Sequence, residues 1–509
     1  MAGTKRFAFN VIMNWIAMAV GMVVPFFLTP LVIRSLGPVA YGVWILAVST
    51  VAYLNLLDLG LRSAIVRFVC AADAQGKIDE VKKVVSAALW LRLLLASVAV
   101  VASIVLSVVF PHLFKVPHDL GRAAQITVLL CALGVAITLV SNVYSGVLAA
   151  MQRFDLLSSI TMTQTVIRAV GVVLILRSGR GLISLAYWEF AVVTITGLIT
   201  IGAAFKVYPA CKVGVARPDA ATFRMLWSHS VITFIWSIAA QIILYTDNVV
   251  IGVFLEVGLV AYYAIGGSLV VYSGQVVGAL STTFVPMASR LDASGNKERL
   301  KTLVLRGCQA SLAIMFPISL TLLFRGKTFI SLWMGPQYSP IAGTVLQILL
   351  ISQFFNAAGS TPASLMMAIG KHKPVAIAAS ISAALNLFLS IVLVKTIGLY
   401  GVAWGTSIAT SIIYLCFWPR YVRKVLGVPI RTYLWTGLGK ITACSIPFAI
   451  ACGAADKFWH PHSLVTFFAQ VLVTLPVYAI SVLAVFRAEA ASLFRRWQDS
   501  RLIRSQALR

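Results

Sequence analysis

The sequence predicts an all-α integral membrane protein with about 14 transmembrane helices. Hydrophobic residues make up 60% of the 509-residue chain and charged residues only 11%, whereas soluble domains carry about 25% charged residues. Apolar runs of about 20 residues or more recur along the whole chain, and this length crosses a hydrocarbon core about 30 Å thick. The runs do not alternate polar and apolar residues, which argues against the strands of a membrane β-barrel.

The first apolar run follows Lys5 and Arg6. It is longer than the apolar core of about 7–15 residues in a signal peptide, so we expect a first membrane helix rather than a cleaved leader. Six helices are predicted in the first half of the chain, over residues 8–33, 39–70, 84–110, 122–149, 154–176 and 181–206. Six more are predicted over residues 225–254, 259–290, 300–324, 340–369, 374–395 and 399–418, and a final pair over 433–453 and 463–486.

A short phrase that occurs twice indicates an internal duplication. Asp73-Ala-Gln-Gly-Lys77 follows one apolar run, and Asp292-Ala-Ser-Gly-Asn-Lys297 follows another, 219 residues later. Further on, Met151-Gln-Arg153 corresponds to Ile369-Gly-Lys371, which lies 218 residues later. A unit of this length far exceeds the 20–50 residues of a solenoid repeat. We therefore expect two copies of one six-helix lobe, and a transporter with its substrate site where the copies meet.

The repeat and the apolar runs together predict four parts of the chain. They are an N-terminal six-helix lobe over residues 1–207, a C-terminal six-helix lobe over 224–425, an additional helix pair over 430–487 and a basic tail over 488–509.

Lys and Arg gather in alternate connections between the predicted helices. The chain has 41 Lys and Arg against 15 Asp and Glu, a formal net charge of +26. With the N-terminus inside, about 30 of the 41 lie at the N-terminus, in the even-numbered connections and in the tail, as the positive-inside rule requires. We therefore predict cytoplasmic N- and C-termini. Topology and contact with anionic membrane lipids account for the basic residues, so no nucleic-acid partner is expected.

Arginines within or beside the predicted spans are the candidates for substrate binding. Ionisable groups are costly at membrane depth and therefore mark functional sites. A cavity lined by arginines suits phosphate or pyrophosphate, because the guanidinium fork binds such oxygens through two hydrogen bonds. The candidates are Arg34, Arg62, Arg67 and Arg168. For Arg34 and Arg67, which lie near helix ends, the alternative is extension of the side chain to lipid head groups.

Two carboxylates, Asp58 and Asp247, are candidates for ion coupling or for structural ion pairs. Asp58 and Arg62 are four residues apart, so on a continuous helix they share one face and can pair. Asp247 lies in Tyr245-Thr-Asp247-Asn248 and has no acidic counterpart in the first half. The two predicted lobes are thus alike in shape and unlike in charge, as a polar substrate bound asymmetrically between them would require.

The sequence contains no recognisable catalytic or metal-binding set. It has no P-loop and no GxSxG motif, and its seven cysteines include no CxxC pair. The histidines lie in or beside predicted connections, and no metal-ligand set accompanies them. We therefore predict no metal, no cofactor and no enzymatic activity. The drive for transport would be the membrane potential or a gradient of H⁺ or Na⁺.

Two further stretches resemble a known family of membrane transporters. They are Arg34-Ser-Leu-Gly-Pro-Val-Ala-Tyr-Gly-Val-Trp44 with Leu57-Asp-Leu-Gly-Leu61, and Tyr245-Thr-Asp-Asn-Val-Val-Ile-Gly252 with Ala261-Tyr-Tyr263. Both are similar to the Wzx-like polysaccharide and O-antigen flippases, within the superfamily of multidrug, oligosaccharidyl-lipid and polysaccharide exporters. The resemblance covers essentially the whole chain.

The resemblance implies two six-helix lobes related by a pseudo-two-fold axis along the membrane normal, and transport by alternating access. It implies a cargo of undecaprenyl-pyrophosphate-linked oligosaccharide, carried from the inner to the outer leaflet of the bacterial inner membrane for polysaccharide biosynthesis. Expected partners are this lipid-linked glycan, membrane lipids, and the glycan polymerase and glycosyltransferases of the same pathway.

Two other function classes remain as alternatives. A multidrug or cation antiporter of the same superfamily would need an acidic, aromatic cavity rather than a basic one. A membrane glycan polymerase or glycosyltransferase would need a sizeable outer loop, and the longest predicted outer loops, over residues 111–121 and 454–462, are short.

Overall fold

The computed structural model describes residues 2–486, with the side chains in this range except those of residues 2–11 and 227–233. No β-strand occurs within residues 2–486, and the helices are joined by short connections. The predicted tail over 488–509 lies outside the described residues.

The elements of the first half are almost all long helices. They are α1 (Ala2–Ala52), the 3-10 turn η1 (Tyr53–Asp58), α2 (Leu61–Ala74), α3 (Ile78–Leu113), η2 (His118–Leu120), α4 (Gly121–Ala150), α5 (Phe154–Arg177), α6 (Leu182–Val207), η3 (Pro209–Cys211) and α7 (Ala220–Phe254).

The second half repeats this pattern and adds a C-terminal pair. Its elements are α8 (Val257–Thr283), α9 (Val285–Ala293), α10 (Lys297–Trp333), η4 (Pro336–Tyr338), α11 (Ser339–Ala368), α12 (His372–Ile397), α13 (Leu399–Ile412), the π-helix η5 (Ile413–Phe417), α14 (Trp418–Leu426), α15 (Ile430–Thr432), the π-helix η6 (Tyr433–Gly439), α16 (Lys440–Phe458) and α17 (Leu464–Val485).

The described chain contains 13 helical segments long and apolar enough to cross a membrane. The first, Ile12–Ala74, is 63 residues long, about three times the 20 or so residues that one crossing needs. Gly37 interrupts it with φ 77° and ψ 167°, values that side chains other than glycine avoid. The break separates the predicted helices 8–33 and 39–70, so the predicted all-helical architecture with about 14 spans is confirmed.

Two predicted helices are each broken into a longer and a shorter piece. The predicted helix 39–70 ends at η1, because Leu59 and Gly60 have positive φ values of 48° and 73°. The predicted helix 259–290 is interrupted at Phe284, and Pro286 stands in the first turn of the following helix α9. Proline favours the first turn because it lacks the backbone N–H that would be unpaired there.

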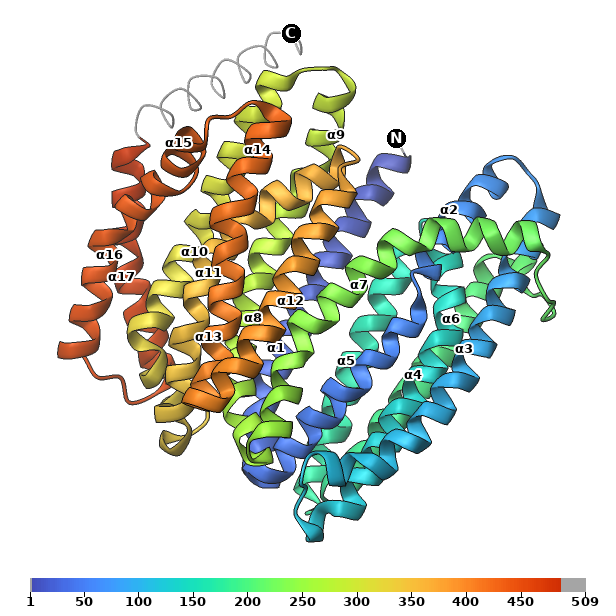
Figure 1. Ribbon diagram of the computed structural model, residues 1–509, viewed down its shortest axis with the longest axis horizontal. Helices are drawn as coiled ribbons and strands as arrows, with labels where there is room; N and C mark the ends of the chain where they lie inside the picture. The colour runs from blue at the N-terminus through green and yellow to red at the C-terminus, as the bar shows by residue number, and fades with distance from the viewer. Residues whose placement is uncertain (1, 487–509) are drawn as a thin grey trace. The chain divides into compact units, whose positions relative to one another are not determined.

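The chain forms two compact units, and each unit combines two stretches that are separate in the sequence. Unit 1 comprises Met1–Ala264 and Ala379–Val402, and unit 2 comprises Ile265–Ala378 and Ala403–Arg509. In unit 1, α4 packs between α3 and α6, and α1 packs on α5 (Figure 1). In unit 2, α10 packs on α11 and also contacts the C-terminal helices α16 and α17 (Figure 1). The division into lobes predicted from the repeat remains a prediction.

The repeat has a physical basis in the hydrophobic cores of the two units. One core cluster in unit 1 and another in unit 2 contain six pairs of buried residues separated by the same 219 positions as Asp73 and Asp292. The pairs are Val69 and Ala288, Val81 and Leu300, Val84 and Leu303, Val85 and Val304, Leu89 and Cys308, and Val147 and Met366. The duplicated sequence therefore builds equivalent packing in each unit.

The repeated phrase itself forms one kind of turn. Gly76 has φ 69° and Gly295 has φ 66°, and each donates its N–H to the carbonyl of the repeated aspartate at 2.9 Å. A left-handed residue after a helix C-terminus satisfies carbonyls that the helix leaves unpaired, and glycine adopts it without strain. In unit 1, Tyr208 Oη also donates to Asp73 Oδ1 at 2.9 Å. Burial and this hydrogen bond raise the pKa of Tyr208 to about 12.

Candidate functional site

Unit 1 contains a polar cavity of about 230 Å³ within its membrane-spanning helices. Its polar lining comes from α2, α4, α5 and α6, and comprises Arg62, Thr138, Ser141, Asn142, Ser145, Thr161, Gln164, Thr196 and Thr200. Leu157, Ile160, Val193 and Gly197 complete it. Hydroxyl and amide groups rarely gather at membrane depth without function, because each one needs a hydrogen-bond partner there.

Close helix packing places these groups around one space. A side chain at Gly146 of α4 would meet Ile65 of α2 at 3.0 Å, and one at Gly197 of α6 would meet Ile137 of α4 at 3.2 Å. Small residues allow helices in membranes to approach closely. These glycines therefore let α4 pack closely against α2, which carries Arg62, and against α6.

The cavity hydroxyls can accept hydrogen bonds from a ligand. Ser145 Oγ donates to the carbonyl of Asn142 at 3.0 Å, and Thr200 Oγ1 donates to that of Thr196 at 2.8 Å. Each hydroxyl that donates to its own helix keeps its oxygen as an acceptor. Arg62, an exposed side chain without an ion-pair partner among the described residues, adds the only charge to the lining. The cavity thus offers many neutral contacts and one cation.

Arg168 lies on α5 and forms an ion pair with Glu189 on α6, with Nη2 and Oε1 2.7 Å apart. The two helices can approach closely because Gly171 has no side chain; a Cβ at this position would overlap the ring of Trp188. Nε1 of Trp188 donates to the Arg168 carbonyl at 3.3 Å. The arginine side chain is 39% exposed and the glutamate 21%. Nε of Arg168 is buried without a hydrogen-bond partner.

Asp58 pairs with Arg92 of α3 and not with Arg62. Nη2 of Arg92 lies 2.6 Å from Oδ1 of Asp58, and the arginine side chain is fully buried. The expected pairing four residues along one helix is wrong because the helix breaks at Leu59 and Gly60, immediately after Asp58. Arg62 then starts a new helix, and its side chain lines the cavity. Asp58 therefore forms its ion pair with a residue of another helix.

Asp247 lies on α7 and is only 5% exposed. Tyr263 Oη donates to its Oδ2 at 2.5 Å, and Ser390 Oγ and Asn386 Nδ2 approach its Oδ1 at 3.3 and 3.5 Å. These partners come from α8 and α12 and are all uncharged. A buried carboxylate at membrane depth is costly as an anion, so binding of a proton or a small cation would stabilise it.

The other two predicted arginines lie apart from the cavity. Arg34 is exposed on α1, three residues before the break at Gly37. Arg67 is exposed on α2, with its guanidinium 5.8 Å from the ring centre of Phe68. Of the four predicted arginines, Arg62 alone lines this cavity.

Sequence reasoning missed two charged residues inside helices. Glu189 is the partner of Arg168, and an inventory of every acidic residue within the apolar run 181–206 would have found it. Arg325 of unit 2 is 1% exposed and donates through Nη2 to Gln470 Oε1. It lies just beyond the predicted end of helix 300–324, which extends to Trp333.

The long apolar helices and the buried polar site define a multi-pass membrane protein. The chain belongs to the polysaccharide biosynthesis protein family, whose model matches residues 31–343. The predicted resemblance is therefore confirmed.

Individual relatives agree with this family. A Shigella flexneri protein described as "Putative O-antigen transporter" is 22% identical over 380 residues, which cover 74% of this chain and 88% of that protein. Among solved structures, the lipid II flippase MurJ in an inward closed conformation gives a TM-score of 0.72 at 18% identity, covering 94% of this chain and 99% of MurJ. An inward-facing multidrug resistance MATE transporter of the MOP superfamily gives 0.70 at 14% identity, covering 82% and 98%. These likenesses show the fold.

Proposed function

We propose that the chain is a flippase for a glycan linked to a polyprenyl pyrophosphate. It would carry this lipid from the inner to the outer leaflet of the bacterial inner membrane by alternating access, as a step of polysaccharide biosynthesis. The observation that carries the proposal is the polar cavity of unit 1, with its single cation Arg62. Membership of the polysaccharide biosynthesis protein family and the names of the relatives support it.

The lining of the cavity suits the polar part of such a lipid. A guanidinium can bind two phosphate oxygens at once, and the hydroxyls and amides can exchange hydrogen bonds with sugar hydroxyls. The cavity of about 230 Å³ is smaller than the 300–1,000 Å³ typical of a ligand pocket. We infer that this conformation admits one part of the head group, and that transport passes through a more open state.

The drive could come from the membrane potential. One charge that crosses the membrane is worth about 2.3 kcal/mol per 100 mV. A pyrophosphate diester carries about two negative charges, so its movement to the positive outer side gains roughly 4–5 kcal/mol per 100 mV. Asp247 provides the alternative, because a proton or Na⁺ that neutralises it would couple transport to an ion gradient. Asp58 is less suited to this role because Arg92 already neutralises it.

The two other function classes find less support in the structure. A cation exporter would need an acidic cavity, and the only charged residue that lines this one is Arg62. A glycan polymerase or glycosyltransferase would need a loop large enough to carry catalytic groups. The connections after α3 and α16 are short, over residues 114–117 and 459–463.

A flipping assay in proteoliposomes tests the proposed cargo. The purified chain would be supplied with a fluorescent lipid-linked oligosaccharide, and its transfer between leaflets would be measured. Arg62→Gln should slow the transfer roughly tenfold or more, since a hydrogen bond to a charged group contributes about 1.5–3 kcal/mol. Arg299→Gln, which removes an exposed charge outside the cavity, is the matched control. Equal transfer by the wild type and Arg62→Gln would contradict the proposed site, and absence of transfer by the wild type would contradict the proposed function.

The same vesicles distinguish transport driven by the membrane potential from transport driven by an ion gradient. A clamped potential, a pH gradient and a Na⁺ gradient would be imposed one at a time. Acceleration by an inside-negative potential alone would support electrogenic transport, whereas a rate that follows only pH or Na⁺ would contradict it. In the second case, Asp247→Asn should remove the gradient dependence while cargo binding is retained. Asp58→Asn should leave that dependence in place.

A further inference from the structure

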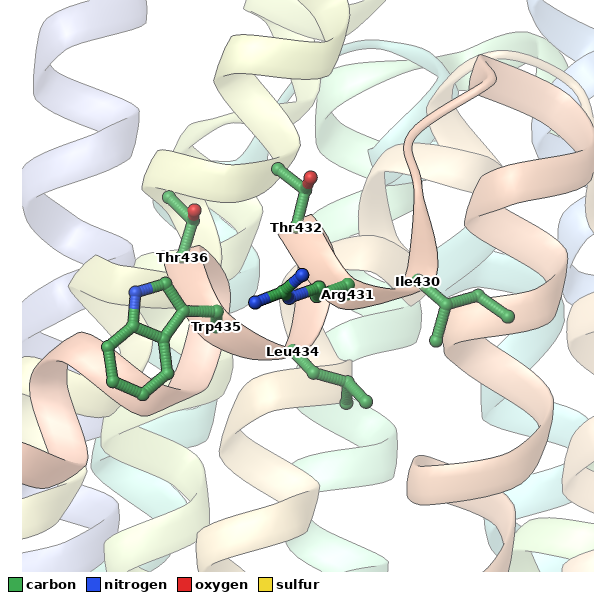
Figure 2. A pocket seen from close by; sticks show the side chains of 6 residues that line it. All are labelled: Ile430, Arg431, Thr432, Leu434, Trp435 and Thr436. Carbon is green, nitrogen blue, oxygen red and sulfur yellow. The ribbon is translucent and has the colours of Figure 1, made fainter.

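Two adjoining surface pockets lie where α14 ends and α15 begins in unit 2. One, of about 380 Å³, is lined by Arg420, Arg423, Lys424 and Ile430. The other, of about 770 Å³, is lined by Ile430, Arg431, Thr432, Leu434, Trp435 and Thr436 (Figure 2). Ile430 lines both, so the pockets form one continuous corner, which we call the α14–α15 corner. None of the residues that line it takes part in the cavity of unit 1.

The α14–α15 corner is strongly cationic. Arg420, Arg423, Lys424 and Arg431 are all exposed, and none forms an ion pair with any of the residues that the structure describes. The sequence has no Asp or Glu between Glu298 and Asp456. Glu298 is itself held by Lys301 at 2.7 Å. Four cations that lack a countercharge within residues 2–486 repel one another, so an anion bound among them would be stabilised.

The corner also has an apolar half. Trp435 is 64% exposed and Leu434 is 36% exposed, whereas the adjacent Tyr433 is buried in the core. Figure 2 shows Leu434 and Trp435 on the turn that follows Arg431. Tryptophan is enriched at the interface between lipid tails and water, because one part of its ring is apolar and the N–H is polar. The corner thus places a tail-compatible surface beside a cationic one.

The backbone holds these two halves together. Gly427 ends α14 with φ 70° and donates its N–H to the Arg423 carbonyl at 2.8 Å. Pro429 precedes α15, and the π-helix η6 follows it. π-helical turns are rare and occur frequently at functional sites. Val428 and Tyr433 are buried in a core cluster of unit 2, so they anchor the backbone that places the charged and aromatic residues of the corner at the surface.

The equivalent position of the first repeat has the same character. Val207 ends α6 and lies 219 residues before Leu426, the end of α14. A pocket of about 690 Å³ follows it, with Lys82, Lys83, Lys212 and Arg217 in its lining. The single lining carboxylate, Asp219, accepts a hydrogen bond from the Thr222 N–H and caps α7. A cationic pocket after the sixth helix of each repeat indicates a common purpose.

We propose that the α14–α15 corner binds the phosphate head group of an anionic membrane phospholipid, with the acyl chain along Leu434 and Trp435. Arginine forks match phosphate oxygens, and basic pockets beside membrane helices bind anionic head groups. A lipid phosphate is shared by phospholipids and by the polyprenyl phosphate part of a glycan carrier. We assign the site to the phospholipid, because the corner belongs to unit 2 and shares no residue with the cavity of unit 1. The assignment does not depend on the proposed cargo.

Native mass spectrometry of the full purified chain tests this site. The probes are phosphatidylglycerol, phosphatidylcholine and undecaprenyl monophosphate, each titrated separately. The double variant Arg423→Gln/Lys424→Gln and the single variant Arg431→Gln remove charge from the corner. Each basic residue near a membrane surface contributes roughly a fivefold change in affinity for anionic lipid. The double variant should therefore bind phosphatidylglycerol about 30-fold more weakly, and Arg431→Gln about fivefold more weakly.

The matched control is Lys371→Gln/Lys373→Gln, which removes one exposed charge just before α12 and one in its first turn, within the same predicted lobe as Arg423 and Lys424. It should leave the high-affinity phosphatidylglycerol adduct unchanged, and Trp435→Ala should weaken binding of all three lipids. An equal loss in the control would overturn the site in favour of general surface charge. Equal binding of phosphatidylcholine would overturn recognition of the head group. Displacement of phosphatidylglycerol by an equimolar amount of undecaprenyl monophosphate would reassign the corner to the carrier lipid.

Discussion

At the scale of residues, charged groups within the helices are balanced by partners from other helices. Asp58 pairs with Arg92 across η1 and α3, and Arg168 pairs with Glu189 across α5 and α6. Asp247 instead has hydroxyl and amide partners. A membrane interior offers no water to stabilise an unpaired charge. The partner is therefore part of the function of each residue, and it decides whether the residue is free to bind cargo or ions.

The Arg168–Glu189 pair leads to a prediction about stability. Replacing either residue by Gln leaves the other charge without its partner. The free energy of unfolding of each single variant should therefore fall by about 1–2 kcal/mol, which is less than for a fully buried pair because both side chains are partly exposed. The double variant should lose less than the sum of the two. Thermal unfolding of the purified protein in detergent measures all three. If Arg168 contacts cargo instead of serving only as a structural partner, Arg168→Gln will slow flipping much more than Glu189→Gln does at equal stability.

At the scale of elements, the internal repeat is visible in the turns that follow α2 and α9. Gly76 and Gly295 stand at equivalent positions with φ near 70°, and no atom lies within 4 Å of a side chain added at either one. The sequence predicts that these turns are related, because the repeated phrase is visible in the printed chain. It does not reveal the break at Leu59, where a residue other than glycine adopts a positive φ of 48°.

These two glycines give a matched prediction. Gly76→Ala and Gly295→Ala should each cost about 1 kcal/mol, because the strain comes from the backbone alone and the surroundings are open. Gly202→Ala is the control, since Gly202 lies within α6 with nothing within 4 Å. It should stabilise the protein by about 0.5–1 kcal/mol through helix propensity. Thermal unfolding of the three variants measures these changes in stability. Unequal losses of stability in Gly76→Ala and Gly295→Ala would argue against equivalent turns.

Within unit 2, a buried polar contact joins the C-terminal pair α16 and α17 to α10. Arg325 of α10 donates to Gln470 of α17, and its guanidinium lies 4.8 Å from the ring centre of Phe467. Ile441, Phe448 and Tyr478 share a hydrophobic core cluster with Leu312 and Met315 of α10. The pair is thus packed into unit 2, although it falls outside the sequence repeat.

The buried arginine leads to a second stability prediction. Gln470→Leu should cost about 2–4 kcal/mol, because it leaves the Arg325 guanidinium buried without its hydrogen-bond acceptor. Adding Arg325→Met to that variant should recover most of the loss, since an apolar pair of similar volume needs no partner. Unfolding in detergent measures both variants. If the double variant is less stable than the single one, the arginine contributes mainly through its ring contact with Phe467.

At the scale of the whole molecule, the sequence predicts what depends on composition and period, and it misses what depends on contacts between distant segments. The membrane class and the span count follow from apolar runs, and the duplication follows from the phrase at Asp73 and Asp292. The partner of Asp58 and the environment of Asp247 do not follow, because Arg92 and Ser390 are remote in the chain. The placement of Ala379–Val402 in unit 1 is of the same kind, since no local pattern marks which helices pack together.

The predicted cytoplasmic termini can be tested together with the number of spans. Starting from a cysteine-free chain, single cysteines would replace the exposed residues Gln75, His118, Ser294 or His460. One membrane-spanning segment separates the first two positions, and five spans separate each later pair, so the four positions must alternate in side. A membrane-impermeant maleimide applied to intact spheroplasts should label His118→Cys and His460→Cys, and leave Gln75→Cys and Ser294→Cys unlabelled until the membrane is opened. The reversed pattern would place the basic connections outside, contrary to the positive-inside rule. Labelling of two successive positions from one side would mean that a segment between them does not cross the membrane.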